Sequence, residues 1–482
     1  MYLFINARSR NAQEKLSLCA ENSRKIFRTA KKHNTFTYKS TSPVALGFGI
    51  IGALVLGYVV QKYLPPPVPK IVGFDLGTTF SSAAVYHAGT GDVEIIRDHL
   101  GRKAFPSVVA FLKNGTVIVG HDAVAQSEHN PTRTFYDAKR FVGKDFTETE
   151  FRKEVSRYPF EMVLNGTKAL FFMAPNKTIA PEEIGAHILR YLKTLTQRQL
   201  ELSPTVIKQS VMSAPAEFDD QQKNATRQAA GRAGVEVLRI ISEPTAAALA
   251  YGLHKKESVE YVMIVDLGGG TLDVSLLFIQ GGMFMTTAMA GNNHLGGQDF
   301  NVRMLSHLIS EIEAYCGDNC TLTDKEDIQN LRLAVESAKI DLTSTMETLI
   351  DVKLHSLVDP VSTKPPLHFK YNFKRSRFES LNGDLLLQIL NPIKAVLEDA
   401  QLSKDQVDEI VLVGGSTRIP EIRRIVADFF QKSPNYGVDP ELAVVTGVAI
   451  QAGVMGGGWP LQVAATELPA KLKKIHVYRE DI

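Results

Sequence analysis

The sequence predicts an α/β protein built from two similar lobes, and three observations support this. Residues 71–79 (IVGFDLGTT) and 263–271 (MIVDLGGGT) share one pattern: an apolar strand, an aspartate, and a glycine turn that ends in threonine. Asp75 and Asp266 lie 191 residues apart, a spacing that indicates two lobes rather than a solenoid. Each copy is followed directly by a second stretch with the composition of a strand.

The first 69 residues divide into three segments. Residues 1–42 form a basic extension, with nine Lys and Arg against two acidic residues. Within the hydrophobic segment 43–64, residues 44–60 carry no charge. We interpret them as a signal anchor with its basic side in the cytosol, or as the apolar part of a cleaved secretory signal. A basic, acid-poor presequence for mitochondria is the alternative. Residues 65–69 (PPPVP) form a stiff proline-rich spacer.

This N-terminal region predicts entry into the secretory pathway, in the endoplasmic reticulum or microsomes. If residues 44–60 are not cleaved, they anchor the protein to the membrane. The last four residues, 479–482 (REDI), weakly resemble an endoplasmic-reticulum retention tail. Glycosylation in that compartment is permitted by five Asn-x-Ser/Thr sequons, at Asn114, Asn165, Asn176, Asn224 and Asn319.

Composition excludes several other classes of protein. The chain is 44% hydrophobic and 22% charged, which excludes a wholly disordered or fibrous protein. A net charge of +2 gives no global sign of nucleic-acid binding. Three cysteines, Cys19, Cys316 and Cys320, cannot form a disulfide scaffold. We interpret Cys316 and Cys320 as ordinary thiols, although a pair or part of a metal site stays possible.

The repeated turns have the chemistry of phosphate loops. A glycine turn lets backbone N–H groups approach phosphate oxygens, and threonine hydroxyls add donors. Asp75 and Asp266 would each place a carboxylate beside a polyphosphate, where it can hold Mg²⁺ through water. Two facing turns would therefore grip a triphosphate from both sides, whereas a G-x-x-x-x-G-K-[ST] P-loop is absent from the sequence. The loop residues are Gly77, Thr78, Thr79, Gly268, Gly269, Gly270 and Thr271.

A third glycine loop follows another apolar strand, at residues 410–420 (IVLVGGSTRIP). Ser416 or Thr417 is predicted to cap the next helix, with Pro420 in its first turn. A helix that starts after a Gly-Gly turn suits contact with phosphate or ribose.

These loops and several longer strings resemble the seventy-kilodalton heat-shock chaperone (Hsp70) family. The strings are YDAKRFVG, SAPAEFDDQQ, SEPTAAALAYG, VDLGGGTLDVS, HLGGQDF and VLVGGSTRIP, and the match runs from about Pro69 to Gly457. The resemblance implies a two-lobed, actin-like and ribonuclease H-like duplicated ATPase fold with the nucleotide in the inter-lobe cleft. Lobe I would span 70–260 and lobe II 261–457. The organisation is most similar to the microsomal stress-70 ATPase core.

The resemblance implies a role for each matching residue in the catalytic centre. Lys139 would contact the γ-phosphate and the attacking water, and Glu243 would order the Mg²⁺ and its water shell. Asp75 and Asp266 would bind water ligands of the metal, supported by Asp273. Read without the family, Lys139 is equally a surface helix lysine, and Glu243 before a proline is a helix N-terminal acid.

The remaining implied contacts concern the nucleotide and the lobes. Thr271 would hydrogen-bond the γ-phosphate as the second loop closes, and Thr78 and Thr79 would cradle the β- and γ-phosphates. Pro215 matches a proline switch between the lobes. Ribose and adenine would be framed by Glu336, Lys339, Thr343, Gly414, Gly415, Ser416 and Arg418.

The sequence departs from the family pattern at three places. Ser242 replaces an asparagine before Glu243, Lys223 replaces the arginine that relays the switch, and Ile340 replaces an arginine that stacks on adenine. Lysine is a weaker fork than arginine for carboxylate or carbonyl contacts. We expect an intact phosphate site with a weakened adenine side and relay.

The C-terminal part is also different. Residues 458–482 read as a tail that is too short for a second core, so no substrate-binding domain is expected after lobe II. Residues 352–374 match the family poorly and contain three prolines, and we interpret them as a surface excursion of lobe II.

The sequence therefore predicts a slow, Mg²⁺-dependent ATPase that acts without peptide stimulation. Its role would lie in protein folding, with ATP or ADP as ligand and nucleotide-exchange proteins or co-chaperones as partners. The alternative is a non-hydrolysing module that senses nucleotide and signals to partner proteins. A sugar kinase of the same superfamily is disfavoured by the chaperone-type strings YDAKR and EPTAAALAYG.

Overall fold

The computed structural model describes residues 69–456, with gaps at 128, 175–176, 204–205, 318–320 and 359–365, together with Gly52 and the stretches 466–468 and 473–477. Apart from Gly52 and Pro69, the three predicted N-terminal segments lie outside the described residues. So do Cys19, Cys320, the sequons at Asn176 and Asn319, and the tail residues 479–482. No helix within the described ranges combines the length and the hydropathy that a membrane span needs.

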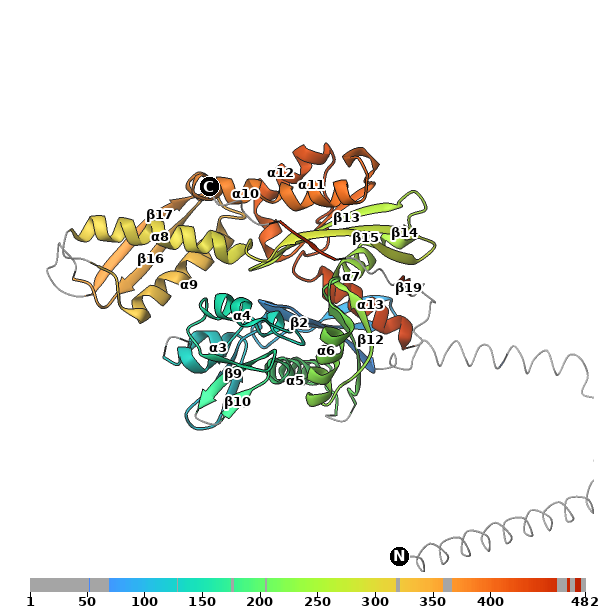
Figure 1. The fold of residues 1–482 in the computed structure, drawn as a ribbon, viewed down its shortest axis with the longest axis horizontal. Helices are drawn as coiled ribbons and strands as arrows, with labels where there is room; N and C mark the ends of the chain where they lie inside the picture. Colours follow the sequence, from blue (N-terminus) through green and yellow to red (C-terminus); the bar gives the residue numbers. More distant parts are fainter. Residues whose placement is uncertain are drawn as a thin grey trace, which may run out of the picture. The chain divides into compact units, whose positions relative to one another are not determined.

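Lobe I is built on a six-stranded mixed sheet (Figure 1). Its order is β12 (Glu236–Ser242), β11 (Gln209–Ala214), β1 (Ile71–Leu76), β2 (Phe80–His87) and β3 (Asp92–Ile95), with β4 (Phe105–Pro106) paired to β2. Strand β1 is parallel to β11 and antiparallel to β2. Successive side chains of a strand point to opposite faces, so Phe74 and Ile71 enter different hydrophobic cores.

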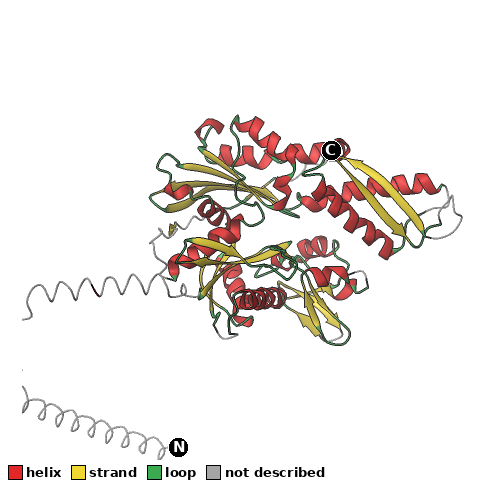
Figure 2. Ribbon diagram, turned by 180° about the vertical axis from the view of Figure 1, so that it is seen from behind, coloured by secondary structure: helices red, strands yellow, loops and turns green. Residues whose placement is uncertain are grey.

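Helices cover both faces of this sheet (Figure 2). The core around Phe74 contains side chains of α5 (Pro181–Gln199) and α6 (Asp220–Arg232). The core around Ile71 contains side chains of α7 (Glu243–Ala250) and α13 (Ala443–Met455). Thr79, just beyond the end of β1, lies close to Gly269, so this end of the strand faces lobe II.

Two small sheets and several short helices extend lobe I. The sheets are β6 (Val117–Val119), β5 (Val109–Phe111) and β7 (Thr134–Phe135), and β10 (Lys177–Ile179), β9 (Lys168–Ala174) and β8 (Met162–Asn165). The helices are α3 (His121–Ala125), α4 (Glu148–Val155), and the 3₁₀ turns η1 (Pro131–Arg133), η2 (Ala138–Arg140) and η3 (Leu253–Lys255). Phe141, directly after η2, is buried against Phe171 with ring centroids 5.9 Å apart, which anchors η2 to the lobe.

Lobe II repeats the plan of lobe I. Its sheet has the order β18 (Glu409–Val413), β13 (Tyr261–Leu267), β14 (Leu272–Gln280), β15 (Met283–Asn292) and β19 (Thr466–Glu467), with β20 (Ile475–His476) also paired to β15. Strand β13 is parallel to β18 and antiparallel to β14, as β1 is to β11 and β2. The two-lobed α/β architecture predicted from the repeat is confirmed.

The outer part of lobe II contains a long hairpin, β16 (Glu347–Leu354) and β17 (Leu367–Lys374). Val352, Leu354 and Phe369 are buried in the main core of this lobe, so the interpretation of residues 352–374 as a surface excursion is wrong for the described strands. The surrounding helices are α8 (Gly297–Cys316), α9 (Lys325–Asp341), α10 (Arg375–Leu387), α11 (Leu390–Asp399) and α12 (Pro420–Phe430), with η4 (Lys404–Gln406) and η5 (Gly415–Arg418).

Helices α7 and α13 cross between the two sheets. Helix α13 packs on β1, β2 and β11 of lobe I, although it lies within the range 261–457 that was predicted for lobe II. Helix α7 contacts β13 and β14 of lobe II as well as α13. A Cβ on Gly447 would lie 1.8 Å from the carbonyl oxygen of Ala246, so this close crossing needs glycine in α13. The pair joins the lobes at the base of the cleft.

Candidate nucleotide site

The two predicted phosphate loops face one another across the cleft. The first follows β1 and the second follows β13. A Cβ on Gly269 would lie 2.6 Å from Oγ1 of Thr79, so the loops approach closely only because this residue is glycine. Ser107 fixes the first loop, since its hydroxyl donates to the carbonyl oxygen of Gly77 at 2.8 Å. The arrangement brings backbone N–H groups and threonine hydroxyls of both lobes to one place.

Lys139 and Glu243 form an ion pair in this cleft. The Lys139 Nζ lies 2.5 Å from Oε1 of Glu243, and the two side chains are only 11% and 19% exposed. Glu243 is the first residue of α7, where the helix dipole favours a carboxylate. Ser242 caps this helix by accepting a hydrogen bond from the backbone N–H of Thr245. Lys139 therefore is not a solvent-facing helix lysine but a charged group held between two elements.

Three carboxyl groups lie close to this ammonium group. Burial, reinforced by neighbouring carboxylates, raises the pKa of Glu243 and raises the pKa of Asp266 well above its ordinary value. Burial also raises the pKa of Asp75, whose Oδ1 accepts a hydrogen bond of 2.6 Å from the Ser213 hydroxyl. Burial lowers the pKa of Lys139, but the surrounding carboxylates outweigh this and its pKa is raised. The raised pKa values mean that ionisation of these carboxyl groups is unfavourable here, a cost that a bound cation would offset.

The donor set suits a magnesium ion that is held through water. Asp75, Asp266 and Glu243 supply the hard oxygen ligands that Mg²⁺ prefers. Within the described ranges, no three His, Cys, Asp or Glu side chains are close enough together to hold an ion directly. The carboxylates would therefore bind water molecules of a hydrated ion, whose remaining ligands would include phosphate oxygens.

The residues predicted to frame ribose and adenine meet on the lobe II side of the second loop. Nζ of Lys339 lies 2.8 Å from Oε2 of Glu336 and donates to the carbonyl oxygen of Gly297 at 3.2 Å. Oγ of Ser416 donates to the carbonyl oxygen of Gly268 at 2.9 Å. These contacts join α9, the start of α8 and the third glycine loop around the second phosphate loop.

Three details of this side bear on the predictions. Ser416 does not cap α12, because its hydroxyl donates to the carbonyl oxygen of Gly268. The hydroxyl of Thr417 donates to the carbonyl oxygen of Gly414. The N-cap residue of α12 is Ile419, which makes no side-chain hydrogen bond. The capping prediction is therefore wrong, whereas Pro420 does occupy the first turn. Ile340 is 56% exposed, which excludes a core position in lobe II.

Several other predicted residues take up positions around the centre. Arg418 pairs with Asp439 and Glu441 rather than with a residue of the two loops. Thr343 lies past the end of α9, where its hydroxyl donates to the carbonyl oxygen of Ile340 at 2.7 Å. Lys223 lies on α6 of lobe I. The positions of Gly414 and Gly415, beside Asp266 and Glu441, agree with a third loop that closes the site from lobe II.

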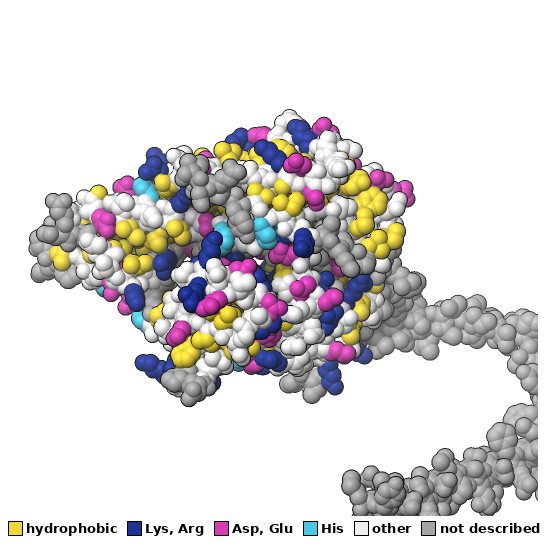
Figure 3. All heavy atoms as spheres, in the orientation of Figure 1, with side chains coloured by type: hydrophobic (Ala, Val, Ile, Leu, Met, Phe, Trp, Pro, Cys, Tyr) yellow, Lys and Arg dark blue, Asp and Glu magenta, His cyan; other side chains and the backbone are white. Residues whose placement is uncertain are grey.

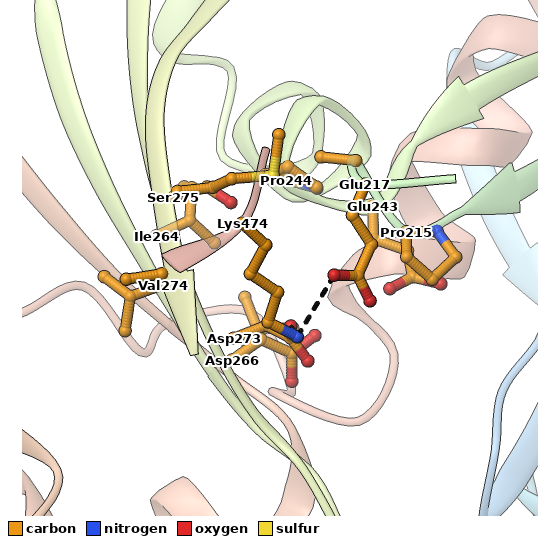
Figure 4. Close-up of a pocket in the computed structure, with 14 residues that line it drawn as sticks. Pro215, Glu217, Glu243, Pro244, Ile264, Asp266, Asp273, Val274, Ser275 and Lys474 are labelled. Atoms are coloured by element: carbon orange, nitrogen blue, oxygen red, sulfur yellow. Dashed lines mark hydrogen bonds and ion pairs between the residues drawn. The ribbon is translucent and has the colours of Figure 1, made fainter. Parts of the chain in front are cut away.

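Two residues of the centre were missed in the sequence. Arg140, next to Lys139 in the YDAKRFVG string, donates to the carbonyl oxygens of Gly270 at 3.2 Å and Asn293 at 3.1 Å, and so ties lobe I to lobe II. Lys474 lines a small pocket with Pro215, Glu217, Glu243, Asp266 and Asp273 (Figure 4). The motif string could have indicated Arg140, whereas no local signal indicates Lys474.

The surface agrees with a charged cleft. On the face seen in Figure 3, basic, acidic and histidine side chains gather along the boundary between the two lobes, while hydrophobic side chains form separate patches. Such a boundary suits a polar, charged ligand better than an apolar one.

Comparison with known proteins agrees with this geometry. Residues 71–466 match the sequence profile of the family described as Hsp70 protein. The chain belongs to the Hsp70 family. Its fold is therefore the actin-like fold of the Hsp70 ATPase domain, and in that family this domain binds nucleotide and Mg²⁺.

Individual members of the Hsp70 family match over most of the chain. The chain is 46% identical over 463 residues to Heat shock 70 kDa protein 13 of Rattus norvegicus and 45% identical to the protein of that name from Homo sapiens. Both matches cover 88% of this chain and 97% of the relative. Chaperone protein dnaK of Cyanidioschyzon merolae is 42% identical over 388 residues, which are 80% of this chain and 62% of that relative.

Proposed function

We propose that the chain is a slow, Mg²⁺-dependent ATPase that binds and hydrolyses ATP between its lobes. The observation that carries this proposal is the Lys139–Glu243 pair, 2.5 Å apart, beside Asp75 and Asp266 and between two glycine loops that face one another. Phosphoryl transfer depends mainly on positioning and on neutralising charge. This set of residues supplies both.

Each residue then has a defined task. The ammonium group of Lys139 would bind the γ-phosphate and orient the attacking water, while Glu243 holds that ammonium in place. Thr79 and Thr271 would donate hydrogen bonds to phosphate oxygens from opposite lobes. When bound, Mg²⁺ neutralises charge on the triphosphate and on the developing transition state. Asp75 and Asp266 would orient its water ligands.

A non-hydrolysing nucleotide sensor is the second candidate. The altered relay favours it, because Lys223 replaces an arginine of the family and is a weaker fork for carboxylate or carbonyl contacts. Single-turnover hydrolysis by the full chain with excess protein separates the two functions. Conversion of bound ATP to ADP that depends on Mg²⁺ supports the ATPase, whereas bound ATP that stays intact over hours supports the sensor.

We further propose a role in protein folding in the secretory pathway, at the endoplasmic reticulum or microsomes. The uncharged residues 44–60 behind a basic extension support this, with a mitochondrial location as the alternative. Co-chaperones or nucleotide-exchange proteins would be the partners, as is typical of the family. Cell fractionation with protease protection tests the location: a protected chain in microsomes agrees with it, and a chain in mitochondria overturns it.

A further inference from the structure

The C-terminal segment returns to the cleft. Strand β19 pairs with the start of β15, and the backbone N–H of Leu468 donates to the carbonyl oxygen of Phe284 at 2.9 Å. Strand β20 pairs with the end of β15, where the N–H of Val477 donates to the carbonyl oxygen of Gly291 at 2.9 Å. The pairing of β20 lies at the end of β15 that neighbours the second phosphate loop, because Asn292 pairs with Leu272 there. Lys474 precedes β20 and is thereby placed at the cleft.

The ammonium group of Lys474 is fully satisfied by acceptors of the two lobes. Its Nζ lies 2.5 Å from Oδ1 of Asp273 and 2.9 Å from Oδ1 of Asn293, both in lobe II. It lies 3.5 Å from Oε2 of Glu217 in lobe I, the contact that is dashed in Figure 4. The side chain is only 4% exposed. Its stem crosses Gly291, where a Cβ would lie 2.5 Å from Cε of Lys474.

The sheet explains why a cation belongs at this place. Asp266 and Asp273 stand directly opposite each other on β13 and β14, and facing like charges destabilise a sheet. In the repeat of lobe I, Asp75 faces Ser82 instead, so the equivalent position there has no facing carboxylates. Lys474 approaches the lobe that has this excess of negative charge.

We propose that Lys474 is a residue of the nucleotide site, an intramolecular cation that favours the anionic nucleotide and competes with a divalent cation for the carboxylates of lobe II. The proposal rests on the assignment of the cleft as the nucleotide site. The segment that carries Lys474 thus changes the charge of the nucleotide site, although it lies outside the three glycine loops.

Removal of this charge should change cation and anion binding in opposite directions. In Lys474→Gln, Mn²⁺ should bind the nucleotide-free protein about tenfold more tightly, because the cluster is more negative. ADP in the presence of a chelator should bind about tenfold more weakly, because an attractive charge is lost. A merely structural role of Lys474 would weaken both.

The matched control is Lys473→Gln, which removes the same charge from an exposed neighbour in the same tail. Both affinities are measured on the full chain, Mn²⁺ by its paramagnetic resonance signal and ADP by calorimetry. Opposite changes in Lys474→Gln, absent from Lys473→Gln, support the proposal. Equal behaviour of the two variants, or a change of both affinities in one direction, overturns it.

A second measurement needs no variant. Amine labelling of the wild-type chain, read by mass spectrometry, should modify Lys473 quickly and Lys474 slowly, and saturating Mn²⁺ without nucleotide should accelerate labelling of Lys474. Equal rates at the two lysines overturn the proposal. Neither measurement depends on hydrolysis, so a chain that does not hydrolyse ATP would reject the proposed function and leave this inference standing.

Discussion

Replacement of Lys139 by alanine should separate hydrolysis of the nucleotide from its binding. The variant loses the group that would contact the γ-phosphate, while the loops that hold the rest of the nucleotide stay unchanged. One positioned charge or donor at a reacting centre contributes about 3–4 kcal/mol, so hydrolysis should fall by ~10²-fold or more. ATP and ADP affinities should change much less.

The same change has a predictable effect on stability. Lys139 and Glu243 are 2.5 Å apart and mostly buried, so the alanine variant leaves Glu243 beside Asp75 without its partner. An unpaired group of this kind costs about 1–3 kcal/mol, and the melting temperature should fall by a few degrees. Because the two residues act as a unit, adding Glu243→Gln should lower the single-turnover rate little further.

Single-turnover quench experiments, calorimetry with ADP and scanning calorimetry measure these three quantities. Lys153→Ala is the matched control, since Lys153 is an exposed lysine on α4 outside the cleft. A hydrolysis rate of Lys139→Ala within about twofold of the wild type would refute the catalytic assignment. An unchanged melting temperature would refute the inference that loss of the ion pair lowers the stability of the fold.

Three further predictions concern the carboxylates, the adenine side and peptides. Without nucleotide or metal, Asp266→Asn should melt a few degrees above the wild type at pH 7, since it removes roughly 1–2 kcal/mol of repulsion among neighbouring carboxylates. Burial and nearby carboxylates raise the pKa of Asp266, so the wild type regains this stability as the pH falls through that raised pKa, and the difference in melting temperature should shrink. Scanning calorimetry that gave a constant or negative difference would contradict this prediction. Ile340→Arg should tighten ATP and ADP alike, by up to roughly twentyfold, through stacking on adenine, and should leave the saturated rate unchanged. Because Ile340 is exposed, the melting temperature of Ile340→Arg should equal that of the wild type. Calorimetry that showed weaker binding of ATP and ADP would reject the adenine assignment. Unfolded peptides should not accelerate steady-state ATP hydrolysis, and a saturable acceleration would show that the chain binds them.

Local patterns sufficed for the parts of the fold that repeat. The strand, aspartate and glycine turn around Asp75 and Asp266 are contiguous in sequence, so the two loops were predictable. The roles expected of Lys139 and Glu243 came from the family strings. The hairpin β16–β17 was misread because three prolines and a poor match to the family outweighed a visible alternation, of Ile350, Val352 and Leu354 in one strand and of Leu367 and Phe369 in the other. That alternation was the better signal.

The contacts that could not be predicted are those between distant segments. Lys474 reaches Asp273 from 201 residues away, and nothing in the neighbouring sequence shows which strand the tail will join. The predicted cap of α12 was wrong for the same reason. The hydroxyl of Ser416 has a competing acceptor in the carbonyl oxygen of Gly268, which lies 148 residues earlier in the chain. The hydrogen-bond partner of a side chain near a glycine loop depends on groups that come together only when the lobes are assembled.

The return of α13 to lobe I has a consequence for how the chain is made. The face of the first sheet that carries Ile71 and Val211 is covered by α13, which leaves the ribosome only after nearly all of lobe II. Until then α7 alone covers part of this apolar face and the rest is exposed, a condition that invites aggregation during synthesis. Ribosome-bound chains that end before Ala443 should therefore recruit general folding factors, and chains that extend past Met455 should release them. A member of a chaperone family would in this way itself be a client while it is being synthesised.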